Sequence, residues 1–147
     1  MLKRWPANAK AERVLNCGLF QEWCESMKQR VVIIGASDNP ERYSHKALIS
    51  LRNHGHDVVP VHPKLAEIEG IAVVSDLSLL SGPVDTVTMY VGAAISAGLA
   101  VKLTALKPRR VIFNPGAENA DLVHALEKSG IACEEACTLV LLNTEQF

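Results

Sequence analysis

Short runs of apolar residues alternate with amphipathic segments along most of the chain. The run V-V-I-I within 30–35 is continuous and β-branched, which is typical of a strand buried on both faces. Comparable runs predict further strands at 57–61, 71–74, 84–91, 110–113 and 131–133. Helical spacing predicts helices over 42–54, 93–106 and 119–129, with a short turn or helix at 138–142.

This alternation of strands and helices predicts the fold class. Strand and helix alternate about five times, a pattern that indicates an α/β fold with a mostly parallel sheet of about five strands. Helices on both faces would make three layers, αβα, joined by right-handed crossovers. We expect 62–70 to be irregular and 77–80 to form a small packed turn.

The N-terminal segment differs in composition from the rest of the chain. Residues 1–30 carry a net charge of +3 and the remainder −4, and both tryptophans, Trp5 and Trp23, lie before Met27. We therefore predict an N-terminal extension or appendage, 1–26, and one domain, 27–147. The extension is open to three interpretations: a basic arm for an anionic partner, a segment docked on the domain, or a stretch preceding a natural start at Met27.

Composition excludes several classes of function. The chain has 147 residues, 48% of them hydrophobic and 5% aromatic, and its net charge is −1. We expect no nucleic-acid partner, because there is neither a basic excess nor an aromatic stacking platform. We expect no membrane partner and a cytoplasmic location, because the longest uncharged stretch, 86–101, is too short to span a bilayer. The four cysteines show no framework spacing and are expected to be free thiols.

Candidate chemistry lies just after the ends of the strands, where parallel α/β sheets bind ligands. After the first strand, Gly35 can provide a tight turn, Ser37 a hydroxyl and Arg42 a cation for a phosphate. Ser37 and Pro40 replace two glycines of the dinucleotide fingerprint G-x-G-x-x-G. A plain strand-to-helix turn is the alternative interpretation.

The second strand ends in His62-Pro63-Lys64, where an NAD site usually has an acid. A cation at this point favours a phosphate on the ribose, as in NADP or coenzyme A. Lys64 could equally be a solvated surface lysine. Tyr90 and the segment 114–116 occupy the corresponding positions after later strands.

Several enzyme classes lack support in the sequence. The chain contains no G-x-S-x-G elbow and no G-x-x-x-x-G-K-[ST] loop. The five histidines have no matched Cys, Asp or Glu ligand set, so we expect no metal site. We identify no catalytic residue, and enzymatic activity is not expected.

Two motifs together resemble the small CoA-binding proteins related to the N-terminal domain of the succinyl-CoA synthetase α-subunit. They are V-V-I-I-G-A-S-D-N-P-E-R-Y-S (31–44) and H-G-H-D-V-V-P-V-H-P-K (54–64), with a V-D-T-V strand start at 84–87. The resemblance covers about 30–142 and implies a Rossmann-like domain that binds coenzyme A.

The resemblance also implies a set of cofactor-binding residues. By position, a first group would meet or border the pyrophosphate, a second group would take the adenosine and its 3′-phosphate, and a third group comes after the later strands. These residues are, in that order, Gly35, Ala36, Ser37, Asn39, Arg42 and Tyr43; Val61, Pro63 and Lys64; and Tyr90, Asn114 and Gly116. The chain departs from many relatives at His62, at 112–119 and at Glu135-Ala-Cys137, which concerns the pantetheine end of the pocket.

The resulting hypothesis is a non-catalytic module that binds CoA or an acyl-CoA and senses or carries it. The alternatives are an NADP-dependent oxidoreductase-like protein and a structural or interaction subunit with an empty nucleotide cleft. The expected partner is a small-molecule nucleotide cofactor, and the sequence indicates no particular protein partner.

Overall fold

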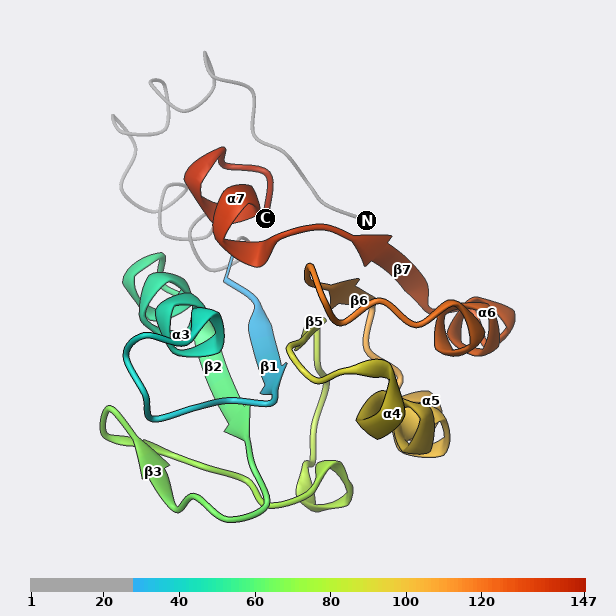
Figure 1. Ribbon diagram of the computed structural model, residues 1–147, viewed down its shortest axis with the longest axis horizontal. Coiled ribbons are helices and arrows are strands. Elements are labelled where there is room, and N and C mark those ends of the chain that lie inside the picture. The colour runs from blue at the N-terminus through green and yellow to red at the C-terminus, as the bar shows by residue number, and fades with distance from the viewer. Residues whose placement is uncertain (1–27) are drawn as a thin grey trace.

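A five-stranded parallel sheet organises residues 28–147, the part of the chain that the computed structural model describes (Figure 1). The strand order is β2-β1-β5-β6-β7, and every neighbouring pair is parallel. The strands are β1 (Arg30–Ile34), β2 (Asp57–Val61), β5 (Thr86–Met89), β6 (Arg110–Phe113) and β7 (Ala132–Glu135). The predicted α/β, Rossmann-like fold with about five strands is confirmed. The predicted extension, 1–26, lies outside the described residues, so the boundary at Met27 stays a prediction.

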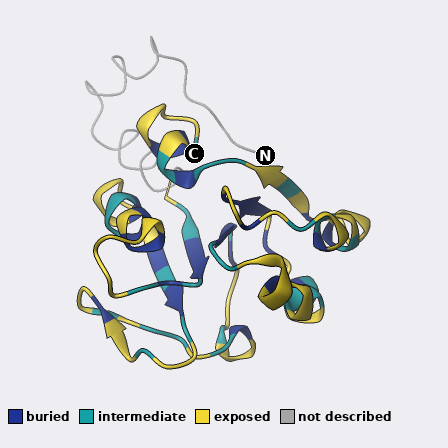
Figure 2. Cartoon of the chain, viewed as in Figure 1, coloured by how far each residue is buried: buried dark blue, intermediate teal, exposed yellow. Residues whose placement is uncertain are grey.

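Helices cover both faces of the sheet, which explains the continuous apolar run in β1. Val31 and Ile33 pack in one core cluster with residues of α3 and α7, whereas Val32 and Ile34 pack in a second cluster with residues of α5 and α6. The inner strands β1, β5 and β6 are accordingly buried, whereas the edge strand β7 and the outer helix faces are largely exposed (Figure 2). The helices are α3 (Tyr43–Asn53), α4 (Ala93–Ser96), α5 (Ala100–Leu106), α6 (Ala120–Lys128) and α7 (Thr138–Asn143).

Two segments differ from their predicted form. The helix expected over 93–106 is divided into α4, a 3₁₀ turn η2 (Ala97–Leu99) and α5, and Gly98, a poor helix former, lies in the turn. The segment 62–70, expected to be irregular, contains β3 (Glu67–Ile68), which pairs antiparallel with β4 (Ile71–Ala72). A strand of two residues, such as β3, is too short to show a recognisable alternation of apolar and polar residues.

Two polar contacts join the small hairpin β3–β4 to α3. The His45 Nε2 and Glu69 Oε1 atoms lie 3.0 Å apart, and the Arg52 guanidinium donates to the Glu69 carbonyl at 2.9 Å. Glu69 has a positive φ of 50°, as tight hairpin turns require. The segment joining β2 to this hairpin is thereby anchored at both ends.

His56, at the amino end of the sheet, makes the stability of the protein depend on pH. Its Nδ1 accepts the Gln29 N–H at 3.1 Å, and its ring packs against Phe147. Burial, with the neighbouring His54 and Arg110, lowers the pKa of His56 from 6.5 to about 4. Between pH 4 and 6.5 the unfolded chain binds a proton at His56 that the folded chain does not. The contribution of the neutral His56 side chain to the free energy of unfolding is therefore complete above pH 6.5 and is lost as the pH falls towards 4.

We expect His56 to account for about 1–2 kcal/mol of that loss, a figure reduced because the ring is partly solvated. Urea unfolding between pH 4 and 7 should show a shallower pH dependence for His56→Asn than for the wild type. His124→Asn, an exposed position on α6, is the control and should keep the wild-type slope. Identical slopes for all three proteins would contradict the assignment.

Candidate functional site

A cleft of about 740 Å³ opens where β1, β2 and β5 end. This is the carboxyl edge of the sheet, where α/β folds bind ligands. The predicted binding residues that line the cleft are Gly35, Ala36, Ser37, Arg42, Tyr43, Val61, Pro63 and Tyr90. Asn39, Lys64, Asn114 and Gly116 are not among the residues that line it.

The turn between β1 and α3 forms one wall of the cleft. Gly35 has a φ of +86° and lies against β5, where a Cβ would come within 2.8 Å of the Val91 Cγ1 and 3.2 Å of the Tyr90 carbonyl carbon. The Ser37 Oγ accepts the Asn39 N–H at 3.1 Å, which leaves its own O–H available as a donor. The Asn39 side chain instead accepts the Glu41 N–H, so Asn39 shapes the turn from outside the cleft lining.

The start of α3 is prepared for an anion. Arg42 occupies the N-cap position but provides no side-chain cap, and the first turn of α3 contains no acidic residue. The first N–H groups of a helix lack intrahelical partners, and the helix dipole adds positive potential there. Arg42, Tyr43 and Ser44 all line the cleft, so this helix end faces the space where a phosphate would lie.

The wall formed by β2 is apolar and has no cation of its own. Val61, His62, Pro63 and Leu65 line it, whereas Lys64 is exposed outside the lining. The His62 Nδ1 accepts the N–H groups of Lys64 and Leu65, at 3.0 and 3.1 Å, so this histidine holds the loop in shape.

Three charged residues of the cleft were missed by sequence reasoning: Asp38, Asp76 and Lys102. Asp76 was missed because the segment after the predicted strand at 71–74 was not considered, whereas Val74 pairs in parallel with Val61 and brings Asp76 to the same edge. Lys102 had a signal in the sequence, since it is the charge that ends the uncharged stretch 86–101. With Arg42, these residues give the lining two acids and two bases, so the cleft is not a basic pocket.

Tyr90 lies at the inner part of the cleft, at the end of β5. Burial, partly offset by the neighbouring Thr138 and Thr88 hydroxyls, raises the pKa of Tyr90 to about 12. Its hydroxyl is buried, and no hydrogen bond of good geometry reaches it. At neutral pH the Tyr90 side chain is therefore uncharged.

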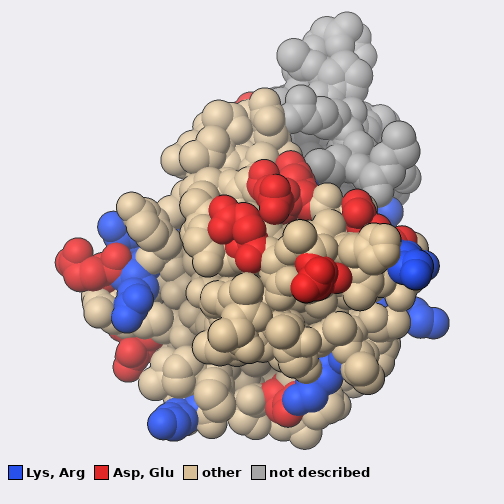
Figure 3. Space-filling view, turned by 45° about the vertical axis from the view of Figure 1, so that its right-hand side comes forward, with Lys and Arg blue, Asp and Glu red and all other residues tan. Residues whose placement is uncertain are grey.

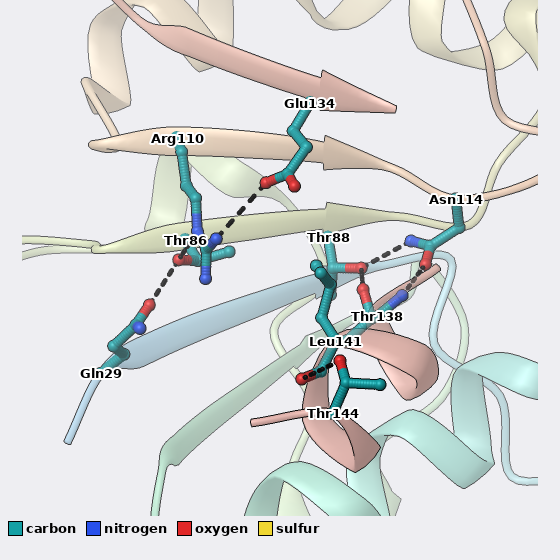
Figure 4. Close-up of polar contacts among 9 residues, drawn as sticks. All are labelled: Gln29, Thr86, Thr88, Arg110, Asn114, Glu134, Thr138, Leu141 and Thr144. Atoms are coloured by element: carbon teal, nitrogen blue, oxygen red, sulfur yellow. Dashed lines mark hydrogen bonds and ion pairs between the residues drawn. The ribbon is translucent and has the colours of Figure 1, made fainter. Parts of the chain in front are cut away.

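Asn114 has a structural position, where its side chain contacts Thr88 and Thr138 (Figure 4). Its Nδ2 donates to the Thr88 Oγ1 at 2.6 Å and to the Met89 carbonyl at 2.8 Å, and its Oδ1 accepts the Thr138 N–H at 2.9 Å. All its side-chain groups thus join β5, β6 and α7. The exposed Gly116 donates its N–H to Glu118, away from the lining.

The described residues contain no group of three or more His, Cys, Asp or Glu side chains that could hold a metal ion. Within 28–147, Cys133 and Cys137 are free, and Cys17 and Cys24 lie outside that range. No helix among these residues is long and apolar enough to cross a membrane. The face drawn in Figure 3 gathers acidic side chains and shows no continuous basic patch.

Comparison with known proteins decides the family. Residues 29–143 match the sequence profile described as a CoA binding domain. The chain belongs to this family. The expected relation to CoA-binding domains is thereby confirmed.

The similar proteins support the assigned fold but say little about activity. An uncharacterised protein of known crystal structure is 37% identical, with a TM-score of 0.77 over 82% of this chain and 98% of its own. The uncharacterised protein YneT of Bacillus subtilis (strain 168) is 34% identical over 62 residues, which are 42% of this chain and 46% of YneT. The dinucleotide forming acetyl-coenzyme A synthetase 1 of Ca. Korarchaeum cryptofilum shares the fold, with 19% identity and a TM-score of 0.64 over 74% of this chain and 25% of its own.

Proposed function

We propose that the protein binds coenzyme A or an acyl-CoA in the cleft and acts as a non-catalytic module that senses or carries it. The observation that supports this most is the β1–α3 turn: the Gly35 turn and the uncapped start of α3 open together onto the cleft of a CoA-binding domain. The pyrophosphate would lie against these N–H groups, with Ser37 and Arg42 as further donors.

The remainder of the lining fits the less polar parts of such a ligand. Tyr43 and Ile95 are 69% and 63% exposed and line the cleft from α3 and α4. Exposed apolar side chains at the mouth of a cleft gain contacts when a ligand covers them.

The proposal of a non-catalytic role is based on the described residues that line the cleft. Among them, no side chain that could act as a base is hydrogen-bonded to a hydroxyl that could act as a nucleophile. His62 uses its Nδ1 within its loop, Asp76 is paired with Lys102, and Tyr90 stays protonated. No hydrogen bond joins a hydroxyl group to an imidazole among the described residues that line the cleft. A hydroxyl nucleophile would need such a base beside it.

Calorimetry and thermal shifts on the full chain test the proposal. CoA and acetyl-CoA should raise the melting temperature, because a ligand at 100 times its Kd stabilises the folded state by about 2.7 kcal/mol. NAD and NADP at the same concentrations should have much smaller effects. Absence of any effect of CoA and acetyl-CoA would overturn the proposal, and tighter binding of NADP than of CoA would favour an oxidoreductase.

A matched pair of variants locates the site. Ile95→Ala removes apolar atoms from the mouth of the cleft and should weaken CoA binding about fivefold, which corresponds to roughly 1 kcal/mol of lost contact. Val140→Ala changes a similarly exposed side chain on α7 outside the cleft and should leave the affinity unchanged. Equal effects of the two substitutions would place the ligand elsewhere.

A further inference from the structure

An ion pair lies within the lining of the cleft, beside the wall that β2 forms. The Lys102 Nζ, from α5, lies 2.7 Å from the Asp76 Oδ2, and Asp76 precedes the 3₁₀ turn η1 (Leu77–Leu79). Both side chains line the cleft and are partly exposed, at 42% and 40%. The pair is therefore accessible to a ligand from the cleft.

Asp76 holds Lys102 without exhausting its donors. The Asp76 Oδ1 accepts the Ser78 N–H at 3.0 Å, which fixes the carboxylate at the start of η1. An ammonium group has three N–H donors, and one of them is directed at the Asp76 Oδ2. Lys102 is thereby oriented while two donors stay available, which suits the several oxygens of a phosphate.

The pair lies beside the end of β2, where the resemblance places the adenosine, rather than at the β1–α3 turn. Val74 pairs with Val61, its N–H donates to the Pro60 carbonyl at 2.9 Å, and its carbonyl accepts the His62 N–H at 3.0 Å. This pairing sets the segment leading to Asp76 beside the end of β2. Lys64, the cation that sequence reasoning assigned to this end, is outside the lining.

We propose that Lys102 is the cation that binds a phosphomonoester on the ribose of the ligand, and that Asp76 orients Lys102 and limits the net charge there. This inference rests on the proposed function and makes the pair the determinant of specificity for coenzyme A over dephospho-coenzyme A. The two partners then act in opposite directions, since Lys102 attracts the phosphate and Asp76 repels it.

This opposition separates a binding role from a structural one. If the pair only fastened η1 to α5, removing either partner would loosen the same contact and change affinity in the same direction. Asp76→Asn keeps an oxygen that can accept the Ser78 N–H, because asparagine is as good a cap as aspartate, and removes the negative charge. Lys102→Met keeps much of the side-chain length and removes the positive charge.

Titration calorimetry of the full chain with coenzyme A and dephospho-coenzyme A gives the decisive comparison. The wild type should prefer coenzyme A about tenfold or more, as a charge-assisted contact provides. Lys102→Met should reduce the preference below about threefold, and Asp76→Asn should increase it about threefold. Lys64→Met is the matched control for loss of a lysine and should keep the wild-type preference.

Affinity for dephospho-coenzyme A serves as the internal control in every variant, and unchanged values would show that the cleft is intact. The inference is overturned if Lys102→Met retains the preference, if both partners shift it the same way, or if Lys64→Met abolishes it. A wild type that binds both ligands equally also overturns the inference and leaves the proposed function standing. A wild type that binds neither ligand refutes the proposed function as well.

Discussion

Asn114→Ala should lower the free energy of unfolding by about 2–4 kcal/mol, because Asn114 joins three elements through buried hydrogen bonds. The substitution leaves the Thr138 N–H without its acceptor and takes a donor from the Thr88 hydroxyl and the Met89 carbonyl. A buried donor without a partner costs more than the net value of the lost bond. Urea unfolding at neutral pH measures the change.

Asn143→Ala is the control for the same chemical change at an exposed position, the end of α7. It should alter stability by less than about 0.5 kcal/mol. Thr88→Val should fall between the two, since Asn114 would keep its bond to the Met89 carbonyl. A loss below about 1 kcal/mol in Asn114→Ala would show that the network is replaceable by water or by local rearrangement.

The inner strands of the sheet could be predicted from the sequence because they are buried on both faces. β1 is a continuous β-branched run, and its alternate side chains enter two different cores, so no polar position interrupts the pattern. The glycines after the strands also indicated turns, because turns need backbone conformations that glycine adopts readily. A strand containing β4 was predicted, but β3 and its pairing with β4 could not be, because this hairpin is stabilised by tertiary contacts of Glu69 with His45 and Arg52.

The sequence brought the residues of the β1–α3 turn to the cleft correctly, because their place depends on a local turn. Gly35, Ala36 and Ser37 are consecutive, so their positions follow from one strand ending at the sheet edge. The charged residues were harder, because charge in a cleft depends on which distant segments meet. Asp76 and Lys102 are separated by 26 residues and are brought together only by the packing of η1 against α5.

Asn114, predicted as a binding residue, lies outside the cleft lining. Its position after β6 matched that of a ligand-binding residue, but the amide turns into the protein to join Thr88 and Thr138 (Figure 4). A polar residue at a strand end satisfies either a ligand or the backbone of a neighbouring element. Only the position of α7, which approaches from the C-terminal end of the chain, selects between these two uses.

Gly35→Ala should impair both stability and binding, since two independent constraints meet at this residue. A left-handed φ of +86° costs an alanine about 1–2 kcal/mol. The added Cβ would also meet the Val91 Cγ1 at 2.8 Å and the Tyr90 carbonyl carbon at 3.2 Å, so the turn or the end of β5 must move. Together these effects should lower the free energy of unfolding by about 2–4 kcal/mol and weaken CoA binding at least tenfold.

Gly130→Ala separates the two constraints. Gly130 has nearly the same φ, +85°, but no atom lies within 4 Å of the added Cβ, and it comes after α6, away from the cleft. It should lose about 1 kcal/mol of stability and keep its affinity for CoA. Unfolding and calorimetry on both variants therefore measure the contribution of close packing between the turn and β5. If Gly35→Ala bound CoA as the wild type does, the β1–α3 turn would not form the pyrophosphate site, and the ligand would have to be held by the walls at β2 and α5.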